Sequence, residues 1–159
     1  MTTALVPGSF DPFHNGHLEV VEAASALFEQ VVVAPVPNPQ KAGSMFDLGE
    51  REAMIAESTG HLRNVRIEAF GGLTVRAADA VGAAVVVKGV RSVADFDNEM
   101  QMAHMNFHLS GVRTVLLPTS PRWSYVASTL VREITRLGGD VSDLVPPPVA
   151  ARLVALAAR

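Results

Sequence analysis

Short runs of β-branched residues alternate along this chain with longer stretches of helical periodicity. Each run is almost continuously apolar, which is typical of strands buried on both faces of a parallel sheet. Parallel strands need crossover connections of one hand, so the alternation predicts a single-domain, doubly wound α/β fold with a Rossmann-like five-stranded parallel sheet. The runs that predict the strands are residues 3–6, 31–36, 65–70, 83–87 and 114–118.

The stretches between these runs carry helix signals. In the first, Leu18, Val21 and Ala24 share one face at helical spacing, and before the second, Asp47 and Glu50 have the spacing of a capping box. Two consecutive glycines, at 138 and 139, predict the end of another helix. The helices are expected at 16–29, 48–58, 74–81, 93–109 and about 129–137, with a C-terminal helix at about 146–158 packing on the body of one domain, 1–159.

Charge and composition narrow the class of function. The chain has 159 residues and a net charge of −3, so the basic surface of a nucleic-acid-binding protein is not expected. It contains no cysteine, which excludes disulfides, thiolate metal sites and a cysteine nucleophile. No segment has the pattern of a signal peptide or the roughly 20 apolar residues of a membrane span. A cytoplasmic protein with no membrane association is therefore expected.

In doubly wound folds, ligands bind beyond the carboxyl ends of the strands. The first such loop contains Gly8, and Gly16 stands where the next helix begins, so backbone amides there can approach a phosphate. His14 and His17 are three residues apart and can point into the same pocket. An imidazole N–H at that position can stabilise charge that builds on a phosphate. Two surface histidines in a loop are the plainer interpretation.

This loop resembles the signature of a known superfamily. Gly-Ser-Phe-Asp-Pro followed by His-Asn-Gly-His resembles the turn of nucleotidyltransferases, whose members share H-x-G-H or T-x-G-H. The resemblance implies nucleotidyl transfer without a covalent enzyme intermediate. It assigns the catalytic role to His17 and contacts with the α-phosphate of ATP to Ser9 and Phe10, with Ser9 also near the substrate.

A second segment follows the fourth predicted strand, where Lys88 and Arg91 flank Gly89. Two cations around a glycine suit an anion clamp, although a solvated basic loop is the commoner outcome for such a pattern. Together with Ala94-Asp95-Phe96 and Glu99-Met100-Gln101-Met102-Ala103, the segment resembles bacterial phosphopantetheine adenylyltransferases. The resemblance implies that Lys88 contacts phosphopantetheine and that ATP is contacted by Gly89, Val90, Arg91 and Glu99. The three methionines on this helix are interpreted as core residues.

A third segment follows the fifth predicted strand. Ser128 and Thr129 open a helix, where their hydroxyl groups can cap it or bind phosphate. The family has a similar stretch lining its ATP site, which assigns ATP contacts to Trp123, Ser124, Tyr125, Val126, Ala127, Ser128 and Thr129. Ala127 replaces the usual serine. The same resemblance assigns substrate contacts to Lys41 and Thr74.

The predicted function is transfer of the adenylyl group of ATP to 4′-phosphopantetheine, which gives dephospho-coenzyme A and pyrophosphate in coenzyme A biosynthesis. Mg²⁺ is expected with ATP, held by phosphates and water rather than by protein ligands; Asp11 is interpreted as a turn former. The resemblance also implies a homohexamer. The family usually has threonine where His14 stands, so nicotinate or nicotinamide mononucleotide as acceptor, or CTP as donor, are alternatives, as is a non-catalytic regulator. A dinucleotide-binding redox module lacks its G-x-G-x-x-G.

Overall fold

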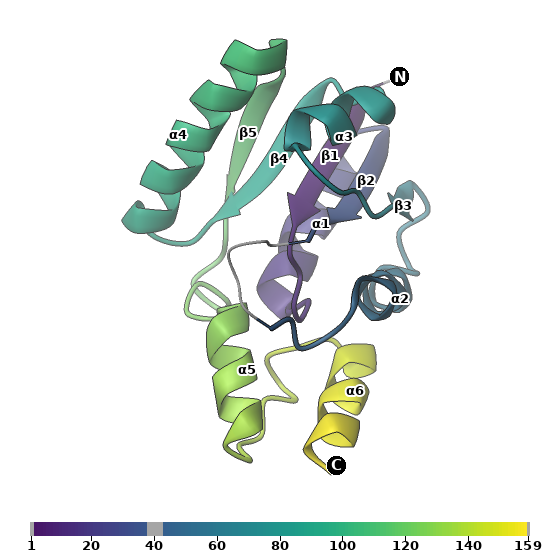
Figure 1. The fold of residues 1–159 in the computed structure, drawn as a ribbon, viewed down its shortest axis with the longest axis vertical. Coiled ribbons are helices and arrows are strands. Elements are labelled where there is room, and N and C mark those ends of the chain that lie inside the picture. The colour runs from purple at the N-terminus through teal and green to yellow at the C-terminus, as the bar shows by residue number, and fades with distance from the viewer. Residues whose placement is uncertain (1, 38–42, 159) are drawn as a thin grey trace.

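The computed structural model describes residues 2–37 and 43–158, and these form one α/β domain around a parallel sheet (Figure 1). The strand order is β3-β2-β1-β4-β5, and every neighbouring pair is parallel. The prediction of a doubly wound five-stranded parallel sheet is confirmed. The strands are β1 (Thr3–Gly8), β2 (Gln30–Pro35), β3 (Val65–Ile67), β4 (Val85–Val90) and β5 (Arg113–Pro118).

The helices begin and end close to the predicted positions. The capping box predicted for the second helix is present, since Asp47 accepts from the Glu50 amide and the Glu50 side chain accepts from the Asp47 amide. The fifth helix stops before Gly138, whose φ of 80° suits glycine. The helices are α1 (Asn15–Leu27), α2 (Leu48–Ser58), α3 (Thr74–Ala80), α4 (Val93–Ser110), α5 (Ser128–Arg136) and α6 (Pro147–Ala157).

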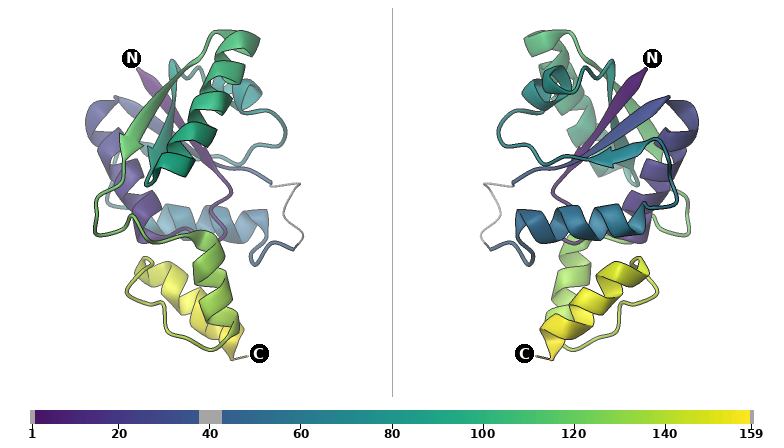
Figure 2. Two further views of the ribbon diagram at one scale, coloured as in Figure 1. Left: turned by 90° about the vertical axis from the view of Figure 1, so that its left-hand side faces the viewer. Right: turned by 90° about the vertical axis from the view of Figure 1, so that its right-hand side faces the viewer.

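The sheet separates two apolar cores, one on each face. Alternate residues of β1 and β2 divide between them: Val6 and Val33 face α1 and α2, whereas Leu5 and Val32 face α3. Figure 2 shows α1 on one side of the sheet and α3 and α4 on the other. Both faces of the central strands are therefore covered, which leaves the ends of the strands as the place for a ligand.

Two expectations about the strands are wrong in detail. The edge strands β3 and β5 are only partly buried, and β3 ends at Ile67 rather than at residue 70. An edge strand has a neighbour on one side only, so continuous apolar sequence did not mean full burial there. The fourth strand runs on to Val90 because Lys88, Gly89 and Val90 pair with β5. These three residues are thus the end of a strand and not a loop.

The part of the chain that follows β5 lies beyond one end of the sheet. Helices α5 and α6 pack against each other, and α6 also packs on α2 through the ion pair of Arg152 with Glu57 (Figure 1). In the part of the chain that the structure describes, none of the helices has the length and apolar character needed to cross a bilayer. The position of α5 matters for the site, because its first residues close one side of the cavity described next.

Candidate active site

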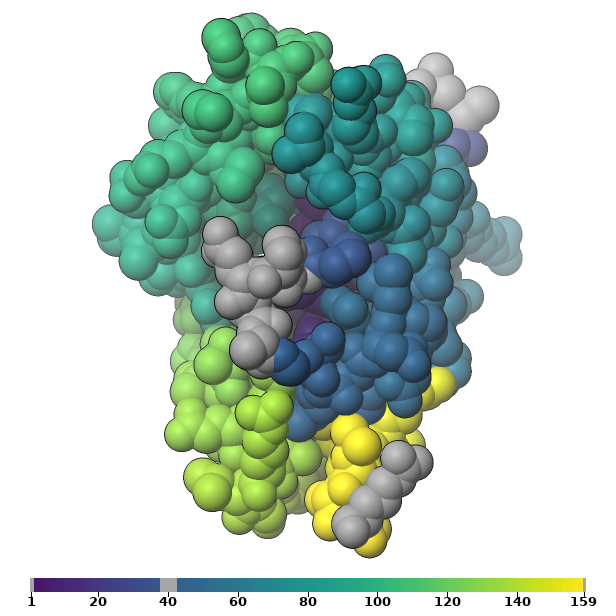
Figure 3. Space-filling view, viewed as in Figure 1, coloured from purple at the N-terminus to yellow at the C-terminus, as the bar shows by residue number. Residues whose placement is uncertain are grey.

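A cavity of about 270 Å³ opens where β1 and β4 end, and it collects most of the predicted site residues. Figure 3 shows a hollow in the middle of this face, with atoms of the N-terminal segment in purple at its bottom. Residues from β1, α1, β4, α4 and α5 line it. Those predicted from the sequence are Ser9, Phe10, His14, Gly16, His17, Lys88, Gly89, Arg91, Glu99, Ala127, Ser128 and Thr129.

The two histidines open helix α1 as a pair. His14 is the N-cap, and its Nδ1 accepts from the amides of Gly16 at 3.1 Å and His17 at 3.3 Å. His17 completes a capping box, because its Nδ1 accepts from the His14 amide at 3.2 Å. The two rings stack with centroids 3.6 Å apart. Since each Nδ1 accepts, the ring proton of each neutral histidine lies on Nε2.

His14 is held neutral by its surroundings. It is buried, and burial together with the positive charge of Arg91 lowers its pKa from the ordinary 6.5 to about 3. A protonated Nδ1 would also lose its role as acceptor for the first helical turn. His14 is therefore a neutral cap at pH 7. His17 lines the cavity beside it, and its ring is perpendicular to that of Phe10, with the two ring centroids 5.0 Å apart.

The glycines of the site make room for protein rather than for a ligand. A Cβ on Gly16 would lie 2.9 Å from Cε1 of His14, and a Cβ on Gly89 would lie 2.6 Å from Cγ2 of Val20. The expectation that Gly16 serves the approach of a phosphate is therefore incomplete. Gly16 leaves space for the capping ring, and Gly89 lets β4 approach α1 so that the two sides of the cavity stand close together.

Both predicted cations of the β4 segment face the cavity, and each is paired with a carboxylate of α4. Lys88 Nζ lies 3.2 Å from Glu99 Oε1, and Arg91 Nε lies 2.9 Å from Asp95 Oδ2. Arg91 also donates through Nη1 to the Val126 carbonyl at 2.6 Å, which ties the end of β4 to the segment before α5. These cations are thus ordered residues of a site, not a freely solvated basic loop.

The start of α5 differs from the prediction. Its N-cap is Ala127, which has no side chain to cap with, and neither Ser128 nor Thr129 caps the helix. Instead Ser128 Oγ donates to the Pro12 carbonyl at 2.9 Å, and Thr129 Oγ1 accepts from Arg132. Ser128 thereby attaches the first turn of α5 to the loop after β1. Both residues line the cavity, so a phosphate contact remains open to them.

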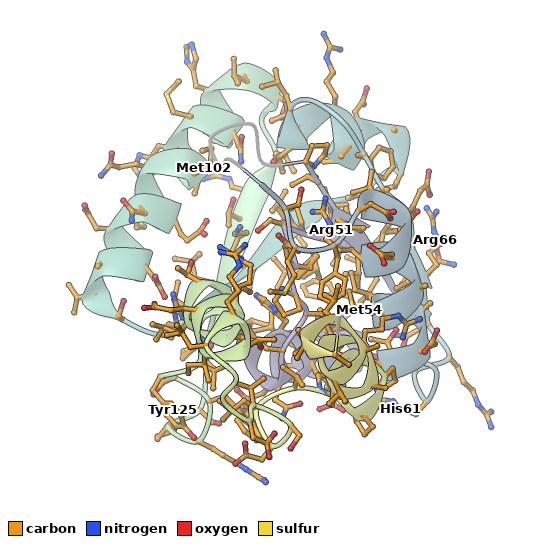
Figure 4. All side chains as sticks on the ribbon, turned by 60° about the horizontal axis from the view of Figure 1, so that its bottom comes forward. Arg51, Met54, His61, Arg66, Met102 and Tyr125 are labelled. Atoms are coloured by element: carbon orange, nitrogen blue, oxygen red, sulfur yellow. The ribbon has the colours of Figure 1, made fainter. Side chains whose placement is uncertain are left out.

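Other predicted residues lie outside the lining of this cavity. Tyr125 is 64% exposed, and Figure 4 shows it at the edge of the molecule. Thr74 lines a separate cavity of about 20 Å³ that shares Lys88 and Glu99 with the first. Lys41 lies outside the described residues. The predicted ATP contacts that are absent from the lining of the larger cavity, as far as the structure describes it, are Val90, Trp123, Ser124, Tyr125 and Val126.

Four residues of the site were not singled out from the sequence. Asp95 and Thr119 line the cavity, and two arginines, Arg51 and Arg132, donate to backbone carbonyls of the loop after β1. Asp95 had a local signal, because it follows Arg91 by one helical turn. The two arginines had none, since each stands far along the chain from the loop that it contacts.

A protein-built metal centre is not evident around the cavity. Among the described residues, no three histidine, aspartate or glutamate side chains cluster in a way that could hold a metal ion. The buried carboxylate of Asp11 is used otherwise, because it accepts from the amides of Met45 and Phe46, both at 2.9 Å. Asp11 thereby fixes the segment that leads into α2, a wider role than that of a turn former.

Comparison with known proteins agrees with this architecture. A solved structure from Vibrio parahaemolyticus, of a protein provisionally named nicotinate-nucleotide adenylyltransferase, superposes with a TM-score of 0.66 at 19% sequence identity. The match covers 97% of this chain and 99% of the other, and it supports the fold. The sequence model of the cytidylyltransferase-like family matches residues 5–134, which run from within β1 into α5 and include every residue that lines the cavity. The chain therefore belongs to the cytidylyltransferase-like family of nucleotidyltransferases.

Proposed function

We propose that this protein transfers the adenylyl group of ATP to the phosphate of 4′-phosphopantetheine, giving dephospho-coenzyme A and pyrophosphate. The observation that carries the proposal is one cavity lined both by the paired histidines at the start of α1 and by the two cations at the end of β4. Adenylyl transfer joins two anions, and this cavity offers two separate cations, Lys88 and Arg91, with an imidazole opposite them. The segment from Lys88 onward, which resembles phosphopantetheine adenylyltransferases, favours this acceptor.

In the proposed reaction, a phosphate oxygen of the acceptor attacks the α-phosphorus of ATP, and the bond from phosphorus to the pyrophosphate oxygen breaks. The attacking phosphate is already an anion, so no strong base is needed. The protein aligns the two phosphates and stabilises charge on the α-phosphate oxygens. Nε2–H of His17 is the proposed donor to those oxygens, and the hydroxyl of Ser9 and the amide of Phe10 assist it.

The cations divide between the two ligands. We assign the polyphosphate of ATP to Arg91, which stands beside the start of α5, and the acceptor phosphate to Lys88. Lys88 also lines the smaller cavity beside Thr74, so we place the groups next to the acceptor phosphate on this side of the site. An incoming phosphate would compete with Glu99 and Asp95 for these cations. Mg²⁺ bound to the phosphates and water of ATP would neutralise part of the polyphosphate charge.

A second acceptor has support of its own. His14 stands where phosphopantetheine adenylyltransferases usually have threonine, and the structural neighbour from Vibrio parahaemolyticus is named for nicotinate mononucleotide. The mechanism would be unchanged with that acceptor, because it also presents a phosphate. In this structure the His14 side chain is used as a helix cap, a role that threonine also performs. The substitution therefore weighs less against phosphopantetheine than the sequence alone indicates.

The test is pyrophosphate release from ATP and Mg²⁺ with 4′-phosphopantetheine or nicotinate mononucleotide as acceptor. We expect release only with phosphopantetheine, together with dephospho-coenzyme A as product. Release only with the mononucleotide would replace the acceptor and keep the reaction. Binding of ATP without release in either mixture would favour a regulator over an enzyme.

A further inference from the structure

Phe10, at the centre of the loop after β1, has a backbone conformation that needs external support. Its φ of 47° lies in the left-handed region, where a bulky side chain is strained. The ring cannot simply move toward β1, because it already fills the space beside Gly8, within 2.8 Å of where a Cβ would stand. Something outside the loop must therefore hold this conformation.

Two arginines from different helices hold the carbonyl groups on either side of Phe10. Arg51 of α2 donates through Nη1 to the Ser9 carbonyl at 2.7 Å, and Arg132 of α5 donates through Nη1 to the Asp11 carbonyl. Arg51 also donates to the carbonyls of Val36 and Asp47, each at 3.3 Å. It therefore joins the ends of β1 and β2 to the start of α2.

Arg51 is unusual for an arginine in being almost completely buried. Only 5% of its surface is exposed, and within the described residues its guanidinium has carbonyl groups but no carboxylate as hydrogen-bonding partners. Figure 4 shows Arg51 in the middle of the molecule, whereas Arg66 and Tyr125 lie at its edges. Burial of a charge is costly unless it serves several acceptors at once, and here three backbone carbonyls of the site are those acceptors.

The orientation of one peptide group follows from this contact. The Ser9 carbonyl and the Phe10 amide belong to the same planar trans peptide, so they point in opposite directions. The carbonyl points to Arg51, which is not among the residues lining the cavity, while Ser9 and Phe10 both line it. No described residue accepts a hydrogen bond from the Phe10 amide. The amide is thus a donor directed toward the side on which the cavity lies.

We propose that Arg51 is a positioning residue for nucleotidyl transfer: it fixes the Ser9–Phe10 peptide so that the Phe10 amide donates to a phosphate oxygen of the bound nucleotide. This inference rests on the proposed function and assigns a role within it to a residue outside the cavity. Lysine at position 51 would keep the charge but, with a single nitrogen, would not hold the three carbonyls in the same geometry.

The first test observes the Phe10 amide directly by NMR and does not depend on turnover. The chain has seven phenylalanines, so ¹⁵N-phenylalanine labelling gives few amide signals, and Phe10→Leu identifies the one from Phe10. Titration with Mg²⁺ and ATP should shift this signal in the wild-type protein and shift it much less in Arg51→Lys. A Phe10 signal that ATP leaves unmoved in the wild-type protein, or moves equally in Arg51→Lys, would overturn the proposal.

The second test separates positioning from stability. Arg51→Lys and Arg51→Met should lower kcat by about 100-fold per folded molecule while the KM for ATP changes less than about threefold, because the misplaced donor acts mainly in the transition state. If Arg51→Met does not fold, Arg51→Lys decides the matter. Arg152→Met is the matched control, since Arg152 also binds α2, through Glu57, but lies away from the cavity. Folded Arg51→Lys with wild-type kcat would overturn the proposal.

Failure of the proposed function would give other results in these two tests than failure of the positioning role of Arg51. In that case the wild-type protein would release no pyrophosphate with either acceptor, while the titration with ATP could still move the Phe10 amide and still depend on Arg51. Loss of activity in the variants together with an unchanged wild-type amide would contradict the positioning role and leave the enzyme assignment intact.

Discussion

His17 is the residue on which the proposed chemistry depends most. Its Nδ1 is occupied by the His14 amide, which directs the proton to Nε2, and its ring is fixed between His14 and Phe10. A donor held in this way costs no reorganisation during the reaction. His17→Ala should lower kcat by about 100- to 1000-fold. Pyrophosphate release under single-turnover conditions measures the effect.

The same variant removes half of a capping box, so its stability must be measured as well. We expect a loss of about 1 kcal/mol in the free energy of unfolding, too small to unfold the domain. His61→Ala serves as control, because His61 lies at the surface, where it pairs with Glu22 at 2.9 Å, and it does not line the cavity. Near-normal turnover in folded His17→Ala would show that another group stabilises the transition state.

His14 should make the fold sensitive to acid. Its pKa is lowered from 6.5 to about 3 by burial and by Arg91, so the unfolded chain binds a proton between these pH values that the folded protein does not. The free energy of unfolding is therefore not reduced by His14 above pH 6.5. It falls as the pH drops from 6.5 toward 3, because protonation of His14 then favours the unfolded chain. Between pH 7.5 and pH 5 this amounts to about 2 kcal/mol in the free energy of unfolding.

His14→Thr tests this directly, because threonine can cap the helix but does not titrate. Urea unfolding at pH 7.5 and pH 5 should show a fall in stability that is about 2 kcal/mol smaller in the variant than in the wild-type protein. Carboxylate titrations are common to both proteins and cancel in this difference. Equal falls in stability would mean that His14 is not held neutral in the folded state.

Local patterns in the sequence were sufficient to identify the site residues that lie close in sequence to a predicted strand. His14, His17, Lys88 and Arg91 were singled out because each stands in the segment that follows a predicted strand, and all four line the cavity. Arg51 could not be found in this way, since the Ser9 carbonyl that it binds lies 42 residues earlier in the chain. Hydrogen bonds from a side chain to a distant backbone group leave no pattern in the sequence.

The approach of one helix to one strand sets the width of the cavity. Gly89 in β4 faces Val20 in α1, and a Cβ at position 89 would lie 2.6 Å from its Cγ2. Val20 is 7% exposed and packs in the core, so it has little freedom to yield. The helix that carries His17 and the strand that carries Lys88 are therefore kept close by the absence of a side chain.

Gly89→Ala should destabilise the domain by about 1–3 kcal/mol through this overlap and should also lower turnover, because α1 must move away from β4. Combining it with Val20→Ala, which removes the methyl groups in question, should recover part of both losses relative to Gly89→Ala alone. Thermal unfolding and the pyrophosphate assay on the four proteins of the cycle measure the coupling. Strict additivity would mean that these two residues do not limit the approach.

The predicted limits of helices and strands were most accurate where a local sequence signal marks the start or end of a helix. They were least accurate where the end of a strand depends on pairing with another strand. The capping box at Asp47 gave the correct start of α2, and the glycines at 138 and 139 gave the end of α5 to within one residue. The end of β4 was placed too early, since Lys88 and Gly89 do not have the composition of a strand. They are strand residues because β5 pairs with them, and β5 is distant in sequence.

At the scale of the whole molecule, the order of the strands in the sheet explains why some strands are fully buried and others only partly. The apolar composition of the strands did not predict this difference. All five strands have apolar sequences, but β3 and β5 are the edges of the sheet and are only partly covered. The order of strands follows from how the helices pack, which is a property of the complete chain. The sequence supported the fold class and the end of the sheet that carries the site, and it did not distinguish edge strands from central ones.

Helix α4 is the part of the molecule that least resembles the surface of a monomer. Only Asn106 of this helix is buried, and several large apolar side chains are about half exposed: Phe96, Met102, Met105, Phe107 and Leu109. Methionines expected in the core are thus at the surface in the single chain. So many exposed apolar side chains on one helix are typical of a surface that binds another protein molecule.

We therefore expect the protein to form the homo-oligomer that its resemblance to phosphopantetheine adenylyltransferases implies, with α4 buried in the contact. Light scattering coupled to gel filtration should give a mass close to six times that of the single chain. Met105→Glu should lower this mass, because a charge would be buried at the contact. Val154→Glu on α6 should leave the mass unchanged, although Val154 is 67% exposed in the single chain and Met105 is 56% exposed. A monomeric wild-type protein would contradict the expectation. A Met105→Glu variant with the full wild-type mass would move the contact away from α4, and the half-exposed side chains of that helix would then face solvent.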